Sequence, residues 1–247
     1  MNFTYLKNYM DRLTSGPVPG NEIVIWKKGA QVFRYWSGFS DKEKNIPMEG
    51  GERFYLYSST KVATVTAALQ LFEQGFFQMT DPISEFLPEY GQMTVKRQAG
   101  QIERTRNAIT VRDLFAMTAG INYDLRSPSI TEAYVRTDGC MNTREVIRSL
   151  AAEPLSFEPG TRWEYGLCHD VLGVLVEEIS GLSLSEYMRR HIFDPLEMDK
   201  TCFRLSENEK GKISPQYWYE PMGNAGKGKV ERWEPINEYV FGPEYDS

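Results

Sequence analysis

Residues 54–64, FYLYSSTKVAT, place a serine three positions before a lysine. Residues i and i+3 share one face of a helix, so a helix that begins near Ser58 brings its hydroxyl close to the Lys61 amine. A serine becomes a strong nucleophile when a neighbouring base takes its proton. A lysine is such a base only when neutral; its ordinary pKa is about 10.4, and burial or a nearby cation lowers it. Ser58 as nucleophile with Lys61 as base is one interpretation.

A helix cap is the other interpretation. Serine is common at helix N-caps, and a lysine one turn later is commonplace. The rest of the chain favours the interpretation of Ser58 as a nucleophile. Its two histidines, His169 and His191, lie outside any recognisable triad context, and the sequence has no G-x-S-x-G elbow. A serine enzyme built on this sequence therefore needs another base, and lysine is the known variant.

A tyrosine supplies a second candidate group. The turn-rich segment FEPGTRWEYG delivers Tyr165 just before a strongly apolar helical stretch. A tyrosine hydroxyl can pass a proton between a nucleophile and a leaving group. Taken alone, the pattern around Tyr165 favours a core aromatic residue at a helix entry over a catalytic role.

Other reactive side chains favour structural roles. Cys140, Cys168 and Cys202 are odd in number and widely spaced, which favours reduced thiols over a disulfide framework. Two histidines argue against a multi-histidine metal centre. Cys168 and His169 suggest thiol catalysis, but adjacent residues on a helix point about 100° apart, so we expect both to be structural.

Composition narrows the class of protein. The 247 residues are 41% hydrophobic and 25% charged, as in a globular protein with a sizeable core. A net charge of −6 argues against nucleic acids and anionic membranes as partners. No apolar run is long enough to span a bilayer, and the N-terminus lacks the pattern of a signal peptide. We therefore expect a cytoplasmic protein.

The order of the elements indicates an α+β fold. The spacing predicts a helix near residues 4–13 and a β-hairpin over 21–41, followed by a short extended segment that feeds Ser58. Helices are then predicted from residue 59 to Gly75, over 109–121 with Thr110 as the N-cap and Gly120 as the stop, from residue 142 to the position before Pro154, and on both sides of Gly181. Ser183 and Glu186 have the spacing of a capping box. Strands at the front and helices in the middle are typical of α+β rather than α/β proteins.

Several segments together resemble one superfamily. They are SSTKVATVTAALQLFEQGFFQMTDPISEFLPEY, then ITVRDLFAMTAGI, then EPGTRWEYGLCHDVLGVLVEEISGLSLSEYMRRHIFDPLEMDKT. Their collinear order over about residues 20–205 resembles the serine β-lactamases and penicillin-binding proteins, in the branch of class C β-lactamases and family VIII carboxylesterases. ITVRDLFAMTAGI is similar to the family's LLTHTSGL segment, and IFDPLEM to its IFxPLGM segment.

The resemblance implies a set of roles. Ser58 would be the acylated nucleophile, Lys61 its general base and Tyr165 the relay of the proton to the leaving group. The oxyanion hole would use the Ser58 backbone N–H and one N–H from a late strand. The family needs no metal or organic cofactor. Tyr57, Tyr123 and Leu167 are our candidates for substrate contacts, with a small ester or a β-lactam-like molecule as the substrate.

Two departures from the family pattern matter. Its Tyr-x-Asn motif is Tyr165-Gly166-Leu167 here. A substrate amide left without its partner costs about 1–3 kcal/mol, so Leu167 favours an esterase over a β-lactamase or D,D-peptidase. The third motif, Lys-Thr-Gly, His-x-Gly or Trp-Gly-Gly, is not found after Tyr165. GNAGKGKV at 223–230 does not replace it and is predicted to be a mobile loop.

The missing motif bears on the domain plan. We expect residues 1–56 to begin an α/β domain, 57–205 to form a helical domain, and 206–247 to be an irregular segment leading to a C-terminal part of the α/β domain that this chain lacks. The site would lie in the cleft between the domains. A two-stranded sheet with a helical layer leaves an open edge. The remainder is expected on a separate C-terminal fragment, in a disordered or proteolysed region, or in residues beyond this sequence.

The function predicted from the sequence is hydrolysis of small carboxylic esters through an acyl-enzyme on Ser58. Leu167 disfavours the first alternative, a β-lactamase or D,D-peptidase-like penicillin-binding protein. The second alternative, a non-catalytic binding protein of the same fold, is supported by the missing third motif and opposed by the intact set of Ser58, Lys61 and Tyr165.

Overall fold

The computed structural model describes residues 1–97, 100–205, 209, 212–221 and 228–233. The chain divides into two compact units. The sheet unit consists of residues 1–55 and 204–237, and the helical unit of residues 56–203 and 238–247. None of the helices in the described part of the chain is long and apolar enough to cross a membrane.

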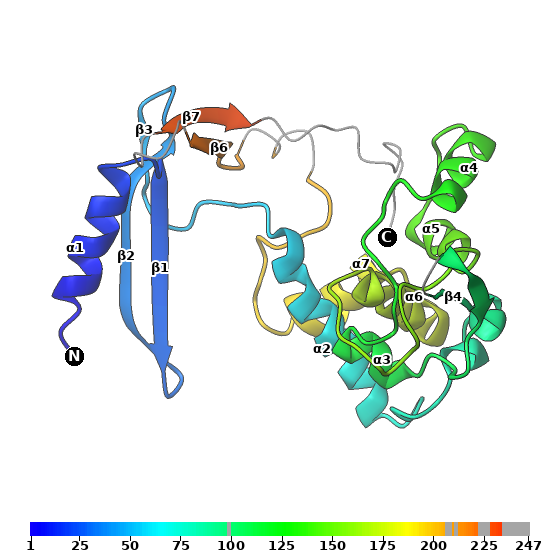
Figure 1. Cartoon of the computed structure of the whole chain (residues 1–247). Helices are drawn as coiled ribbons and strands as arrows, with labels where there is room; N and C mark the ends of the chain where they lie inside the picture. The colour runs from blue at the N-terminus through cyan, green and yellow to red at the C-terminus, as the bar shows by residue number, and fades with distance from the viewer. Residues whose placement is uncertain (98–99, 206–208, 210–211, 222–227, 234–247) are drawn as a thin grey trace. The chain divides into compact units, whose positions relative to one another are not determined.

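The sheet unit is built on an antiparallel hairpin. Helix α1 (Thr4–Thr14) precedes β1 (Gly20–Lys27), β2 (Ala30–Asp41) and the short β3 (Ile46–Pro47), which pair in the order β1-β2-β3. Helix α1 runs beside the hairpin (Figure 1). Its position is fixed by the hydroxyl of Tyr35, which donates to Asp11 at 2.6 Å, and by the stacked rings of Phe3 and Phe33, 4.6 Å apart.

A second hairpin belongs to the same unit. Strands β6 (Gln216–Pro221) and β7 (Gly228–Trp233) pair antiparallel. The Tyr217 hydroxyl accepts the N–H of Lys42 at 2.8 Å and donates to Glu43 at 2.6 Å, which ties β6 to the end of β2. The prediction of an irregular segment over 206–247 is wrong at this hairpin. Consecutive aromatic residues suit a pleated strand, but the Gly- and Pro-rich surroundings obscured that signal. Most of the predicted mobile loop at 223–230 lies outside the described residues.

The helical unit holds most of the regular structure. Its elements in chain order are η1 (Tyr57–Ser59), α2 (Thr60–Glu73), η2 (Ile83–Glu85), η3 (Pro88–Gln92), β4 (Thr94–Lys96), β5 (Ile102–Arg104), α3 (Val111–Ala116), α4 (Pro128–Arg136), α5 (Thr143–Leu150), α6 (Cys168–Ser180), α7 (Leu184–Met188) and the π-helical turn η5 (Arg189–Phe193). Strands β4 and β5 form a small antiparallel pair.

Helix α6 is the centre of this unit. Its residues 171–176 are all buried, and α2, α3, α5 and α7 pack around it (Figure 1). A helix that is apolar on every side is stable only when neighbours enclose it. Gly173 permits the close approach of these neighbours, because a Cβ there would lie 2.9 Å from Leu184 and 3.8 Å from the methyl group of Thr64 on α2.

Helix ends show where the sequence reasoning succeeded and where it failed. Thr110 and Asp113 form a reciprocal capping box at the start of α3, as the predicted N-cap requires. The helix ends earlier than Gly120, since Met117 already adopts a left-handed backbone with φ of 54°. At α7 only half of the predicted capping box exists: Ser183 accepts the Glu186 N–H. The Glu186 carboxylate pairs with two arginines of η5 instead.

Two further segments complete the comparison with the sequence. The short segment before Ser58 has one isolated bridge, between residue 53 and Ile213, and the backbone then enters the 3-10 turn η1. Helix α4 was not predicted at all. Its start is marked by Pro128 at the first position, where the missing N–H costs nothing, yet its two buried apolar residues, Ile130 and Ala133, give too weak a periodic signal.

Candidate active site

The backbone that carries Ser58 and Lys61 is helical throughout. Turn η1 leads directly into α2, so the two residues lie one turn apart on continuous helical backbone. Ser59, not Ser58, is the N-cap of α2, and it makes no side-chain capping bond. Ser58 is exposed, and its hydroxyl shares a 2.6 Å hydrogen bond with the Tyr165 hydroxyl. The capping interpretation of Ser58 therefore does not describe what its side chain does.

The residue before Ser58 has a strained backbone. Tyr57 adopts φ of 45°, in the left-handed backbone region that residues other than glycine rarely occupy. Such a conformation costs about 1–3 kcal/mol and persists only where the surroundings enforce it, most often at functional sites. The strain turns the chain sharply into η1, and the Tyr57 side chain is half exposed.

Tyr165 is held by a glycine and by the backbone on either side of it. A Cβ on Gly166 would lie 1.9 Å from the carbonyl oxygen of Ile121, so no other residue fits there. The N–H of Glu164 donates to Met117 at 3.1 Å, and that of Leu167 to Asn122 at 3.3 Å. These contacts fix the loop that presents the Tyr165 hydroxyl to Ser58. The sequence reasoning gave no role to Gly166.

Two aromatic rings adjoin the lysine. The Nζ atom of Lys61 lies 5.3 Å from the centroid of the Tyr165 ring and 5.9 Å from that of Tyr123. The two rings stack with their centroids 5.6 Å apart. A ring face attracts a cationic side chain, so both rings contribute to holding the Lys61 side chain beside them. Tyr123 thus lies beside the candidate catalytic groups.

Electrostatics single out Tyr165. Its pKa is lowered, first by the hydrogen bond from Ser58 and then by the hydrogen bond and positive charge of Lys61; burial and the carboxylate of Asp170 oppose the shift. A tyrosine with a lowered pKa gives up its proton more readily than an ordinary phenol. The arrangement therefore brings together a serine hydroxyl, a phenol that releases its proton readily and an amine, so that a proton can pass among the three groups.

The remaining predicted residues are placed differently. Leu167 is only 3% exposed and belongs to the hydrophobic core, and its contact with a substrate stays a prediction. Burial raises the pKa of the Cys168 thiol to about 11. The Nε2 atom of His169 lies 3.2 Å from the carbonyl oxygen of Phe115. Both positions agree with structural roles for Cys168 and His169. Among the described residues, no group of three or more potential metal ligands converges.

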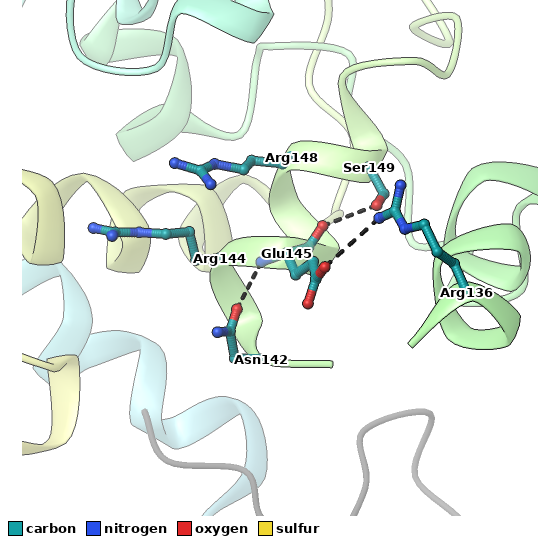
Figure 2. Close-up of a pocket in the computed structure, with 6 residues that line it drawn as sticks. All are labelled: Arg136, Asn142, Arg144, Glu145, Arg148 and Ser149. Atoms are coloured by element: carbon teal, nitrogen blue, oxygen red, sulfur yellow. Dashed lines mark hydrogen bonds and ion pairs between the residues drawn. The ribbon is translucent and has the colours of Figure 1, made fainter. Parts of the chain in front are cut away.

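A concavity lies on α4 and α5. It has a volume of about 560 Å³ and is lined by Arg136, Asn142, Arg144, Glu145, Arg148 and Ser149. Figure 2 shows Glu145 pointing toward Arg136, with Asn142 capping the helix below. Arg144 and Arg148 pair with Glu178, and Arg148 also with Glu89. Each of the three arginines has a carboxylate partner, so we interpret the concavity as a surface network of ion pairs.

Comparison with known proteins agrees with this geometry. The model of the family described as Beta-lactamase matches residues 5–234. The chain belongs to the Beta-lactamase family. This membership confirms the predicted superfamily and, with the mixed helices and antiparallel strands, the predicted α+β fold.

Two curated relatives match most of this chain. Protein Rv1367c of Mycobacterium tuberculosis is 30% identical over 208 residues, which cover 82% of this chain and 52% of the relative. Protein flp of Staphylococcus aureus is 27% identical over 233 residues, covering 93% of the chain and 44% of the relative. The chain thus spans about half the length of the curated relatives it matches.

Solved structures show the same fold. The hydrolase EstCE1, described as having promiscuous acyltransferase activity, is 25% identical with a TM-score of 0.73, and the match covers 93% of this chain and 59% of EstCE1. Simvastatin synthase LovD from Aspergillus terreus is 24% identical with a TM-score of 0.70, covering 94% of this chain and 62% of LovD. At its level of identity, LovD shows the fold alone.

Proposed function

We propose that this chain carries the catalytic residues of a serine hydrolase that cleaves small carboxylic esters. The observation that carries the proposal is the 2.6 Å hydrogen bond between the hydroxyls of Ser58 and Tyr165, with the Lys61 amine beside the same tyrosine ring. A nucleophile in hydrogen-bond reach of a proton acceptor, which in turn neighbours a third group, is the general signature of an activated serine.

The proposed reaction has two halves. Ser58 Oγ attacks the ester carbonyl while its proton passes to Lys61, and Tyr165 relays that proton to the departing alcohol. The C–O bond to the alcohol breaks and an acyl-Ser58 ester remains. Water then attacks the acyl carbon, gives one proton to the same relay and releases the carboxylic acid, which restores the Ser58 hydroxyl. The developing oxyanion would accept a hydrogen bond from the Ser58 backbone N–H.

The surroundings of the site support an ester over a β-lactam or a peptide. Leu167 replaces an amide side chain in the family pattern and points into the core, so position 167 offers the substrate no hydrogen-bonding group. Tyr57 precedes Ser58 in the chain, Tyr123 lies beside Lys61, and both side chains are about half exposed. Exposed aromatic side chains beside the candidate catalytic groups suit contact with a small apolar acyl group. The hydrolase described for EstCE1 is consistent with this choice.

Covalent labelling tests the proposal on the chain as it exists. The protein is incubated with a fluorophosphonate, and its intact mass is measured beside that of Ser58→Ala. We expect a single adduct on the parent chain and none on Ser58→Ala. Ser59→Ala is the matched control, because Ser59 is the neighbouring hydroxyl and makes no capping bond; it should label like the parent. An adduct that persists in Ser58→Ala would overturn the assignment.

Substrate class is tested separately. The rate of release from a short-chain nitrophenyl ester is compared with the rate of hydrolysis of a chromogenic cephalosporin. We expect the ester to react faster by about a hundredfold or more, the effect of about 3 kcal/mol of lost polar recognition. A faster cephalosporin rate would transfer the assignment to the β-lactamase or peptidase alternative, and binding of an ester without turnover would favour a non-catalytic protein.

A further inference from the structure

A buried carboxylate lies on helix α6 close to the candidate catalytic groups. Asp170 is in the first turn of α6, and within the described part of the chain its Oδ2 atom is buried and accepts no hydrogen bond. A buried carboxylate oxygen without a partner is costly, so such a group is normally held in place by a nearby cation. Nothing in the reaction described above uses this residue.

Helix packing puts Asp170 opposite Lys61. Gly173 on α6 faces Thr64 on α2, with only 3.8 Å between its Cβ position and the Thr64 methyl group. Asp170 precedes Gly173 by three residues, and Lys61 precedes Thr64 by three residues. Residues three apart share a helix face, so Asp170 and Lys61 lie on the facing sides of the two helices, one turn before that contact.

The charges in this region agree with that placement. Burial raises the pKa of Asp170, while the positive charge of Lys61 is the main influence that lowers it, followed by its own backbone N–H and His169. The same Lys61 charge lowers the pKa values of Tyr165 and His169. The groups that feel the Asp170 charge are therefore Lys61 from α2, and Tyr165, Cys168 and His169 from α6 and the loop before it.

We propose that Asp170 is a positioning residue for Lys61: its carboxylate orients the amine toward Ser58 and Tyr165 and stabilises the ammonium ion that forms when Lys61 takes the Ser58 proton. Asp170 thus serves as the third group behind nucleophile and base. It touches neither substrate nor the reacting atoms. This inference rests on the proposed function for its catalytic meaning, but the Asp170–Lys61 interaction itself does not.

The interaction is measured by competitive acetylation of the full chain. Trace acetic anhydride labels only neutral amines, and the labelled fraction of the Lys61 peptide is followed by mass spectrometry from pH 6 to pH 12, about the range over which lysines titrate. Asp170→Asn removes the negative charge that the proposal places opposite the Lys61 amine. The pH of half-labelling of Lys61 should therefore fall in this variant.

A matched control comes from the same helix. Glu177→Gln also replaces a buried-side carboxylate of α6 by its amide, and the glutamine oxygen can still accept the Leu184 N–H that Glu177 accepts at 2.7 Å. It should leave the Lys61 half-labelling pH unchanged. Asp170→Ala serves if the asparagine is not accommodated at the α2–α6 contact. No shift with either Asp170 variant, or an equal shift with Glu177→Gln, would overturn the inference.

Phosphonylation of Ser58 supplies the catalytic readout. In Asp170→Asn the acidic limb of the rate–pH profile should move to lower pH together with the Lys61 half-labelling pH, and the plateau rate should fall about tenfold because the ammonium product is less stabilised. A rate loss with no movement of the limb would indicate a merely structural role and overturn the inference. A parent chain whose Ser58 does not label would refute the proposed function, while the acetylation shift would still establish the Asp170–Lys61 interaction.

Discussion

The two units of this chain differ in how they bury their apolar side chains. The helical unit has a continuous core that includes nearly every face of α6. Among the described residues of the sheet unit, only Met10 and Met48 are buried hydrophobic side chains. The sheet unit exposes large apolar residues instead: Tyr5, Tyr9, Val24, Trp26, Trp36, Phe39, Ile46, Phe54, Tyr55, Trp218 and Tyr219. The difference teaches that the proposed chemistry sits in the unit that is stabilised by its own core.

The sheet unit buries few of its apolar side chains within itself. Exposed apolar groups scattered singly are ordinary, but a sheet with almost no buried side chains gains little free energy from its own packing.

The largest expected effect contrasts matched truncations in the two units. Leu172 on α6 is fully buried, and Leu172→Ala should lower the free energy of unfolding by about 2–5 kcal/mol. Val24 on β1 is 40% exposed, and Val24→Ala should change it by about 0.5 kcal/mol or less. Urea denaturation followed by circular dichroism measures both. Equal losses would mean that the sheet unit contributes a core of similar weight, and the contrast between the units would be lost.

The next effect sharpens the role of the helical unit in positioning Tyr165. Gly166→Ala places a Cβ against the Ile121 carbonyl and must displace the loop, so Ser58 phosphonylation should slow by about a hundredfold. Gly91→Ala is the control, because its Cβ would meet only Ser84 at 3.6 Å, an ordinary contact. Labelling rates for the two variants are compared at one pH. An unchanged rate in Gly166→Ala would show that Tyr165 is not held where it acts.

The smallest effect lies in the sheet unit. Tyr217→Phe removes the hydroxyl that joins β6 to residues 42 and 43, and should cost about 0.5–1.5 kcal/mol for a partly exposed hydrogen bond. Burial is also the main reason that the pKa of Tyr217 is raised to about 12. Hydrogen exchange of the Lys42 amide should accelerate in the variant while amides of α6 keep their protection. Acceleration in α6 as well would mean that the two units unfold together.

Part of the fold and part of the candidate site could be predicted from the sequence. Ser58, Lys61 and Tyr165 were predicted as one site, and the structure brings their side chains together. Gly166 was missed because its role depends on the close approach of Ile121, which is distant along the chain. The role proposed for Asp170 likewise depends on Lys61, which is distant along the chain. A signal for Asp170 did exist: it is the one acidic residue in the apolar run of α6 before Glu177.

The strand pair β6–β7 shows a different limit. Local propensity marked its aromatic residues as strand formers, but nothing local indicated what they would pair with. The hydrogen bonds of Tyr217 to residues 42 and 43 span most of the chain, and such pairings cannot be read from periodicity. The early end of α3 at Met117 is similar, since a left-handed methionine is dictated by the loop it starts and not by its own preference.

The bonds that anchor the Tyr165 loop also have an evolutionary consequence. Backbone carbonyl groups within residues 117–122 accept hydrogen bonds from the N–H groups of Ser156, Gly160, Glu164 and Leu167. These hydrogen bonds hold both ends of the intervening segment in place. Lengthening a segment whose ends are held together costs little additional entropy. Insertions at exposed positions of the turn between α4 and α5, such as Asp138 and Cys140, can thus accumulate without moving Tyr165. Lineages that share one reaction can in this way diversify the surface beside it.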